Sequence, residues 1–384
     1  MLKRTNTQIL NQKLGQYPAV VLVGPRQCGK TTLAKALPNT HYFDLEKESD
    51  RLRLDLEWGE LVKSQHCVVL DEAQTCPELF PRLRGAIDDD RKRNGRFLLL
   101  GSVSPALMRN IAESLAGRLA ICEQTPFHAS ELPGEQWDDL WCHGGYPDGG
   151  VLDAARFPGW PMDYLSLLAQ RDFPIWGLAS PPAITLRLIK MLAAVNGQQW
   201  NASQIAASMG LSYHTINNYL DFLEQAFLIR RIPAWSGNNL KRLVKSPRVY
   251  WRDSGLCHAL LGLQSRDALF DQPWVGSSWE GWVIEQLLTA FQLSGIFADA
   301  SWVRTHHGQN EVDLFVTFGS ERWAIEIKLT THPKSEDFKG LRKMDELLKP
   351  TRRIVLSRTR ECFWNHEEAS VNLNVLLEQI KDFK

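Results

Sequence analysis

The sequence predicts an α/β protein: a doubly wound parallel sheet, then a helical module, then a second, smaller α/β domain. Three observations lead to this prediction. Strand-like and helix-like segments alternate over the first ~130 residues, the pattern of a parallel sheet with crossover helices. Two helical patterns separated by a short turn precede two short strand patterns within residues 184–253. A strand hairpin is predicted at residues 310–330.

Length and composition set the outer limits. The chain has 384 residues, more than one compact domain usually holds, and equal numbers of basic and acidic residues, 44 of each. Net charge therefore indicates no class of partner, and any basic surface must be local. The 7 cysteines are scattered without a C-x-x-C pair, there is no leader-like segment, and no apolar run approaches ~18 residues. We expect a cytoplasmic protein with free thiols and no membrane partner.

The first element of the sheet ends in a glycine-rich loop. Residues 21–32 read VLVGPRQCGKTT and fit G-x-x-x-x-G-K-[ST] between a strand and a helix. Glycines allow the backbone to approach a ligand, and the loop N–H groups with the helix N-terminus favour phosphate. A chance strand–turn–helix is the alternative, but the flanking elements are those the motif requires. The expected nucleotide contacts are Gly24, Pro25, Arg26, Gln27, Cys28, Gly29, Lys30, Thr31 and Thr32.

Lys30 would reach the β- and γ-phosphates of a nucleotide, and the Thr31 hydroxyl would ligate Mg²⁺. A second strand, in HCVVLDEAQ, ends in the acidic pair Asp71 and Glu72, about 40 residues after the loop. Asp71 would hold Mg²⁺ through water, and Glu72 would orient and deprotonate the attacking water. A third strand, RFLLLGS, ends at Ser102, whose hydroxyl would sense the γ-phosphate unless it belongs to a plain turn.

Arg118 follows Gly117 in AESLAGRLAI, at the end of a helical pattern. An arginine there could reach the γ-phosphate of a neighbouring subunit and stabilise the charge of the transition state. The alternative is a surface arginine at a helix end, and Arg109 is a weaker candidate for the same role. If Arg118 acts in trans, the active form is a self-associated ring, for which we expect a hexamer.

Residues 18–131 resemble the AAA+ superfamily, in particular the archaeal-type ATPases, through GPRQCGKTT, VVLDEAQ, LLLGS and SLAGR. The resemblance implies ATP and Mg²⁺ as cofactors and ATP hydrolysis as the activity. Members of that family are often fused to a C-terminal domain, which the rest of the chain resembles through GGYP at 144–147, KSPRVYWRDSGL at 245–256 and GSSWEGWVIEQLL at 276–288. We therefore expect an ATPase core at 1–136, a lid or connector at 137–183, a winged helix-turn-helix at 184–260 and a final domain at 261–384.

The winged-helix prediction rests on helix signals. Asn201 is a candidate N-cap and Gly210 a stop for the first helix, and Ser212 is a candidate N-cap for the second. The second helix would bury Ile216, Leu220, Leu223 and Phe227, and LIRRIPAW and RVYWRD would form the wing. Its exposed start would carry Tyr213, His214 and Asn217 to nucleic acid.

The charge pattern of the wing also favours DNA. No acidic residue lies between Glu224 and Asp253. The stretch holds Arg230, Arg231, Lys241, Arg242, Lys245, Arg248 and Arg252, of which we expect the first five to contact DNA phosphates. A lid or a protein contact is the alternative for this module.

The last domain carries a separate set of charged residues. On the second strand of its hairpin Glu326 and Lys328 share a face, and Asp313 can oppose them from the first. Two carboxylates and a lysine could bind Mg²⁺ through Asp313 and Glu326. The arrangement resembles the PD-(D/E)xK nucleases, in the style of the archaeal Holliday-junction resolvases, with Val312 in place of the motif's proline. That resemblance implies a helical carboxylate, for which Glu280 is preferred over Glu285. The fold can also persist without cleavage.

Two classes of function follow. In the first, the chain is a DNA-dependent ATPase that remodels or translocates DNA, branched DNA included, while the C-terminal domain holds or cuts it. In the second, the ATPase is a nucleotide-dependent switch in signalling or defence, and its C-terminal modules bind a protein partner. The basic wing and the set Asp313, Glu326 and Lys328 favour the first class.

Overall fold

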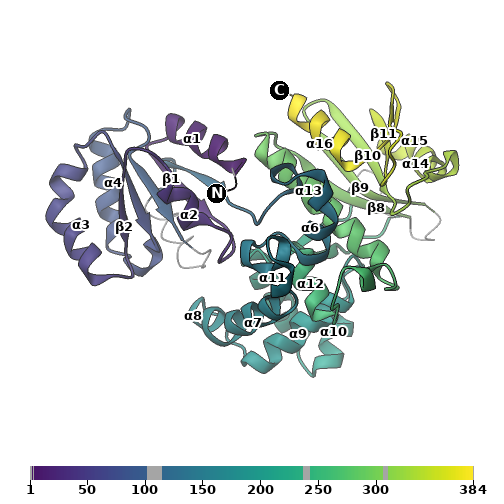
Figure 1. Ribbon diagram of the computed structural model, residues 1–384, viewed down its shortest axis with the longest axis horizontal. Coiled ribbons are helices and arrows are strands. Elements are labelled where there is room, and N and C mark those ends of the chain that lie inside the picture. The colour runs from purple at the N-terminus through teal and green to yellow at the C-terminus, as the bar shows by residue number, and fades with distance from the viewer. Residues whose placement is uncertain (1, 3, 102–114, 237–242, 306–309, 384) are drawn as a thin grey trace.

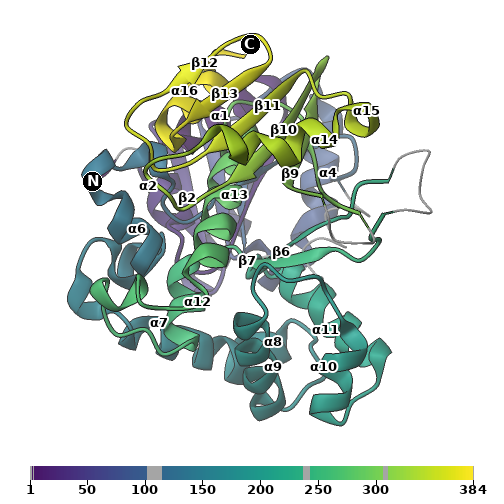
Figure 2. The same ribbon diagram turned by 90° about the vertical axis from the view of Figure 1, so that its right-hand side faces the viewer.

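The computed structural model describes residues 2, 4–101, 115–236, 243–305 and 310–383 of the chain. Figure 1 shows an N-terminal sheet with its helices on the left, a helical body below and a C-terminal sheet at the upper right. The long helix α13 (Val275–Leu293) extends from the helical body to the C-terminal sheet (Figure 2). No helix in these described ranges is both long and apolar enough to cross a membrane.

The N-terminal sheet has five parallel strands in the order β2-β3-β4-β1-β5. The strands are β1 (Ala19–Val23), β2 (Thr40–Asp44), β3 (Cys67–Asp71), β4 (Phe97–Leu100) and β5 (Leu119–Glu123). The helices are α1 (Asn6–Gln16), α2 (Lys30–Lys35), α3 (Glu48–Leu61) and α4 (Leu79–Asp89). Side chains of β1 alternate between a core shared with α3 and α4 and one shared with α1 and α2. Because both faces are covered, all of β1 is buried, and the predicted doubly wound core is confirmed.

The helical body contains most of residues 137–260. Its helices are α6 (Trp137–His143), α7 (Gly159–Leu167), α8 (Phe173–Ile175), α9 (Pro182–Ala194), α10 (Ala202–Met209), α11 (Tyr213–Gln225) and α12 (Ser254–Leu260). Its antiparallel two-stranded sheet is formed by β6 (Ile229–Ile232) and β7 (Arg248–Trp251).

The predicted helix caps of this body are present. Asn201 Oδ1 accepts from the Gln204 N–H and Ser212 Oγ accepts from the Thr215 N–H, each at 3.1 Å. Gly210 ends α10 in a left-handed conformation. Phe227 departs from the prediction, because α11 ends at Gln225 and Phe227 has φ 61° beyond it. Its ring therefore packs against the N-terminal core instead of the inner face of the helix.

The C-terminal sheet has six strands in the order β12-β13-β11-β10-β9-β8. The strands are β8 (Asp299–Arg304), β9 (Glu311–Phe318), β10 (Glu321–Ile327), β11 (Arg352–Leu356), β12 (Phe363–Trp364) and β13 (Glu368–Val371). The helices are α13, α14 (Phe338–Lys343), α15 (Asp345–Leu348) and α16 (Leu373–Asp382). Trp323, Ile325 and Ile327 face α13 and α16 while Ala324 faces α14, so the predicted alternation along β10 is confirmed.

Candidate functional site

The loop between β1 and α2 is shaped by its two glycines. Gly24 has φ 149°, and a Cβ on it would lie 2.1 Å from the carbonyl oxygen of Gln124. Gly29 has φ 94° and precedes α2. Only glycine tolerates this close approach and this backbone region, so both positions require it. The loop therefore lies against the residue that follows β5, at the carboxyl edge of the sheet, where ligands of such sheets bind.

Lys30 is the first residue of α2 and is buried. Its ammonium donates hydrogen bonds to the carbonyl oxygens of Gly24 at 2.9 Å and Pro25 at 2.7 Å. The lysine thus lies folded over the loop at the start of a helix, where backbone N–H groups favour an anion. It can exchange these carbonyls for phosphate oxygens without leaving the loop.

Thr31, the next residue, reaches the acidic strand. Thr31 Oγ1 donates to Asp71 Oδ2 at 2.8 Å, although 40 positions separate the two residues. The hydroxyl and the carboxylate are hard oxygen ligands of the kind Mg²⁺ prefers, so this pair fits a Mg²⁺ ion that accompanies a nucleotide. The contact arises because β1 and β3 are parallel strands whose carboxyl ends meet at one edge, separated only by β4.

Tyr42 is a site residue that the sequence analysis missed. From β2, its hydroxyl donates to the same Asp71 Oδ2 at 2.5 Å. Burial and the neighbouring Asp71 raise the pKa of Tyr42, so the phenol keeps its proton and remains a donor. A tyrosine two residues before the end of the neighbouring strand was the only sequence signal for this contact.

Glu72 has φ 55°, in the left-handed region where few residues other than glycine are found. Its backbone N–H donates to Asp71 Oδ1 at 3.0 Å, and the Gln74 amide donates to its carboxylate. Burial raises the pKa of Glu72, in spite of the Gln74 contact and nearby cations. A carboxylate whose pKa moves toward neutrality is better suited to accept a proton from water.

Other residues of the loop contact the segment after β5 and the helical body. The Cys28 thiol donates to the Gln124 carbonyl at 3.3 Å. Arg26 pairs with Asp172 at 2.9 Å, and its carbonyl accepts from the Tyr164 hydroxyl at 3.2 Å. The side chains of Arg26 and Cys28 thus make contacts that fix the loop, and nucleotide binding by these loop residues stays a prediction. Residues 137–183, predicted as a connector, contact the nucleotide loop directly through Tyr164 and Asp172.

Arg118 lies at the opposite edge of the sheet from the nucleotide loop. It immediately precedes β5, whose first residue pairs with the start of β1, and a five-residue strand spans about 16 Å. Its guanidinium pairs with both oxygens of Asp88 in α4 at 2.9 Å. It cannot serve the site of its own chain from there. Ser102 and Arg109 lie outside the described residues.

Two arginines of the predicted basic wing are paired with carboxylates. Arg230 donates to Glu285 at 2.6 and 3.0 Å, and Arg231 pairs with Asp221 at 2.7 Å and with Glu224. This corrects the expectation that both arginines are available to phosphate. The carboxylates that the sequence stretch lacks come from α13, far along the chain, and from α11.

The remaining DNA-contact candidates divide into three groups. Tyr213, His214 and Lys245 are exposed. The Asn217 amide oxygen accepts from the Trp200 indole N–H at 3.0 Å, so this side chain is committed within the body. Lys241 and Arg242 lie outside the described residues.

The charged residues predicted in the C-terminal domain do gather. Lys328 donates to Glu326 at 2.5 Å, and Asp313 Oδ2 accepts from the Ile327 N–H at 2.9 Å. Glu280, on α13, lies near Asp313 and accepts from the Tyr250 hydroxyl at 2.5 Å. Burial and then the charge of Asp313 raise the pKa of Glu280 to about 8 and that of Glu326 to about 7. We call Glu280, Asp313, Glu326 and Lys328 the carboxylate cluster.

One further residue enters the carboxylate cluster from the helical body. Arg248 Nη1 lies 2.8 Å from Glu280 Oε1 and 3.6 Å from Asp313 Oδ1, and its other nitrogen pairs with Glu311. The described residues contain no group of three or more histidine, cysteine, aspartate or glutamate side chains arranged to hold a metal. As they stand, the carboxylates therefore do not fit the Mg²⁺ site expected from the nuclease resemblance.

Comparison with known proteins identifies the chain's relatives. Residues 16–133 match the family described as "AAA domain", while residues 134–267 and 275–376 match the domains of unknown function DUF8612 and DUF4143. Over 328 residues the chain is 35% identical to the uncharacterized proteins Mb2031c of Mycobacterium bovis and Rv2008c of Mycobacterium tuberculosis, covering 84% of this chain and 73% of each relative. The chain belongs to the family of these two proteins. Its N-terminal domain is a P-loop ATPase domain of the AAA type.

Among solved structures, the Walker-type ATPase PABY2304 of Pyrococcus abyssi aligns with a TM-score of 0.47 at 16% identity. The alignment covers 68% of this chain and 96% of that chain. A similarity this weak places no residue of the present chain.

Two motifs of the regions after the AAA domain form one packing unit. The Asp253 carboxylate accepts from the Gly145 N–H at 2.7 Å and from the Leu256 N–H at 2.9 Å. A Cβ on Gly144 would lie 2.1 Å from Asp253 Oδ1, and one on Gly255 would lie 1.9 Å from the His143 carbonyl oxygen. Because these glycines allow α6 and α12 to meet, GGYP and RDSGL have a structural role that connects the two ends of the helical body.

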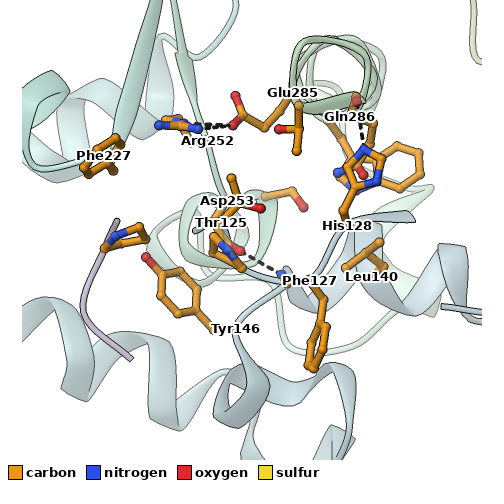
Figure 3. A pocket seen from close by; sticks show the side chains of 16 residues that line it. Thr125, Phe127, His128, Leu140, Tyr146, Phe227, Arg252, Asp253, Glu285 and Gln286 are labelled. Carbon is orange, nitrogen blue, oxygen red and sulfur yellow. Dashed lines mark hydrogen bonds and ion pairs between the residues drawn. The ribbon is translucent and has the colours of Figure 1, made fainter. Parts of the chain in front are cut away.

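A cavity beside the AAA domain lies where the three bodies meet. It is lined by Pro25 of the nucleotide loop, by the segment after β5, and by Arg252, Glu285 and Gln286, the last three labelled in Figure 3. Arg252 Nη2 pairs with Glu123 at 2.6 Å and with Glu285 at 2.7 Å. Burial alone would raise the pKa of Glu285, but Arg230 and Arg252 outweigh it and lower this pKa to about 2. The AAA domain is thus joined to α13 by a network of ion pairs centred on the buried Glu285.

Proposed function

We propose that the chain binds Mg-ATP and hydrolyses it, and that the nucleotide cycle changes how β7 and the C-terminal domain are held. The 2.8 Å contact between Thr31 Oγ1 and Asp71 Oδ2 carries the first part, because it brings together the two side chains that would hold Mg²⁺. Lys30 binds the β- and γ-phosphates, and Glu72 accepts the proton of the attacking water. Mg²⁺ supplies neutralisation of the phosphate charge.

The second part rests on contacts that join the nucleotide loop to the other bodies. Arg26 of the loop pairs with Asp172 of the helical body at 2.9 Å. Gln124, against which Gly24 packs, follows Glu123, and Glu123 pairs with Arg252 beside α13. A bound phosphate that draws Lys30 and the loop toward itself therefore also acts on residues that already contact the helical body and the region beside α13. This favours a nucleotide-dependent switch.

The direct test of hydrolysis is calorimetric titration of Mg-ATP combined with phosphate release. The wild-type chain is expected to bind and turn over ATP. Lys30→Ala is expected to lose at least tenfold in affinity, because one charge-assisted phosphate contact is worth about 1.5–3 kcal/mol. Lys63→Ala, which removes an exposed lysine beyond the end of α3, is the matched control and should retain binding. Equal affinity of wild type and Lys30→Ala would contradict the proposed site.

A second candidate function is DNA binding by the helical body, read as a winged helix, and by the C-terminal domain, read as a PD-(D/E)xK-like domain. The exposed side chains of Tyr213, His214 and Lys245 favour DNA binding. So does the order of elements in the C-terminal domain, where α13 is followed by the antiparallel strands β8, β9 and β10, then by α14 and α15, and then by the parallel strand β11. The neutralised Arg230 and Arg231 favour a protein partner instead.

ATP turnover measured alone and with single-stranded, duplex and four-way-junction DNA separates these candidates. A DNA-dependent ATPase is stimulated by at least one of these forms, and its DNA affinity falls steeply with salt as counterions are released. Replacing Tyr213, His214 and Lys245 should remove that stimulation. Turnover unchanged by every DNA at low salt would leave the switch with a protein partner.

A further inference from the structure

The guanidinium of Arg248 lies inside the carboxylate cluster, although β7 belongs to the two-stranded sheet of the helical body. Only 10% of its side chain is exposed. Its nitrogens reach Glu280 at 2.8 Å, Asp313 at 3.6 Å and Glu311, which come from α13 and β9. One cation thus bridges three carboxylates from two elements of the C-terminal domain.

Further contacts hold this arginine in place. Its Cζ lies 4.5 Å from the centre of the Trp302 ring, so the planar guanidinium packs on an aromatic face. Tyr250, two residues further on the same face of β7, donates to the same Glu280 oxygen at 2.5 Å. The guanidinium of Arg248 is therefore held by the aromatic ring against which it packs, by the carboxylates that pair with its nitrogens and by a neighbouring hydroxyl.

The charges around the cluster show what Arg248 replaces. Glu280, Glu311, Asp313 and Glu326 face Arg248 and Lys328, and Arg304 approaches Glu311 at 3.4 Å. Carboxylates gathered in a buried place need a cation, and a divalent ion with oxygen ligands would satisfy the same need. Arg248 and a divalent ion compete for Glu280 and Asp313, because two cations that share these oxygens would repel each other.

We propose that Arg248 is an internal plug of the carboxylate cluster: its guanidinium occupies the cation position and keeps a divalent cation out of it. The proposal rests on the proposed reading of the C-terminal domain as nuclease-like. It adds an explanation of how Arg248 keeps a metal ion out of that site.

The same strand connects the plug to the AAA domain. Arg252 lies four residues after Arg248, and its guanidinium pairs with Glu123, the last residue of β5, and with Glu285. Gln124, directly after β5, contacts Gly24 and the Cys28 thiol of the nucleotide loop. A displacement of the loop that moves Glu123 therefore acts on the strand that carries Arg248.

The test measures Mn²⁺ binding to the nucleotide-free full chain by electron paramagnetic resonance of the free ion. Wild type is expected to have no Mn²⁺ site that Asp313→Asn removes. Arg248→Met should gain one Mn²⁺ site, with an affinity for Mn²⁺ at least tenfold higher than that of any Asp313-dependent binding by wild type. Asp313→Asn in the Arg248→Met background should abolish that site. Arg231→Met, which removes an arginine outside the cluster, should bind Mn²⁺ as wild type does.

Arg248→Lys covers the case in which Arg248→Met does not fold. Lysine keeps the positive charge, but it lacks the planar fork and the stacking on Trp302, so Mn²⁺ should compete with it more easily than with arginine. Thermal melts of each variant establish which of them are folded.

Three results would overturn the proposal. If wild type already binds Mn²⁺ at an Asp313-dependent site as tightly as Arg248→Met, the arginine is not a barrier. If the folded Arg248 variants gain no Asp313-dependent site, the cluster is not a metal site and the nuclease-like reading fails with the plug. If the gained site survives Asp313→Asn, the ion binds elsewhere. None of these results depends on ATP hydrolysis, which is measured separately.

Discussion

Thr31 Oγ1 and Tyr42 OH both donate to one oxygen of Asp71, at 2.8 and 2.5 Å. The two donors come from α2 and β2, so that Asp71 is held in a fixed orientation by two separate elements. The second oxygen of Asp71 accepts from the Glu72 N–H at 3.0 Å. Tyr42 is therefore a positioning residue for the carboxylate that would face Mg²⁺.

Tyr42→Phe should weaken the use of Mg²⁺ without removing ATP binding. Loss of a hydrogen bond to a charged group costs about 1.5 kcal/mol, roughly a tenfold effect. We expect the Mg²⁺ concentration that gives half-maximal turnover to rise about tenfold, measured by phosphate release. Tyr17→Phe, an exposed tyrosine, is the matched control. A Mg²⁺ dependence identical to wild type would remove Tyr42 from the site.

Arg118 should act between subunits or not at all, because it lies about 16 Å of strand away from the nucleotide loop of its own chain. Mixing Arg118→Ala with Lys30→Ala chains is expected to restore part of the turnover that each lacks alone. Size measurements during turnover should show a self-associated ring. A chain that stays monomeric, with turnover per chain independent of concentration, would exclude this role.

Gly144→Ala should destabilise the helical body. Gly144 has φ 79° and ψ −179°, a region used almost only by glycine, and its added Cβ would meet the Asp253 carboxylate at 2.1 Å. We expect the free energy of unfolding to fall by at least about 2 kcal/mol and the thermal midpoint of unfolding to fall by about 5 °C. Gly134→Ala, where nothing lies within 4 Å of the new Cβ, is the control and should melt as wild type does.

The network around Glu285 should make stability depend on pH in the acid range. The pKa of Glu285 is about 2, below the ordinary 4.5, so its contribution is fully present above pH about 4.5 and is lost as pH falls toward 2. Glu285→Gln should lower the free energy of unfolding by about 3 kcal/mol at pH 7, because it leaves the half-buried Arg230 and Arg252 with less compensation. Urea unfolding measured from pH 7 to 3 should show that the gap in unfolding free energy between the variant and wild type narrows below pH 4.5. A gap that is constant with pH would contradict the ion network.

The nucleotide site could be predicted because its signals are local. Gly24, Gly29, Lys30 and Thr31 are consecutive members of one loop, and Asp71 ends an apolar strand that can be recognised by itself. The caps Asn201 and Ser212 were predictable for the same reason, since each acts within three residues. The alternation of β10 followed from the two-residue period of a strand.

What the sequence could not show are contacts between elements far apart in the chain. The stretch from Arg230 to Arg252 looked like an uncompensated basic wing, yet Glu285 and Glu280 reach it from α13. Counting charges within one stretch of the sequence was therefore misleading, because ion pairs also form between residues that are far apart in the chain but close in space. Tyr42 escaped notice for a similar reason, since its contact depends on the pairing of β2 with β3.

The most direct test of the central claim, hydrolysis of Mg-ATP at this site, is single-turnover measurement on Glu72→Gln. The amide keeps the size of the side chain and leaves Lys30, Thr31 and Asp71 in place, but it cannot accept the proton of water. The account predicts that Glu72→Gln binds Mg-ATP within about threefold of wild-type affinity while the rate of phosphate formation falls at least a hundredfold. Phosphate formation at the wild-type rate by folded Glu72→Gln would contradict it.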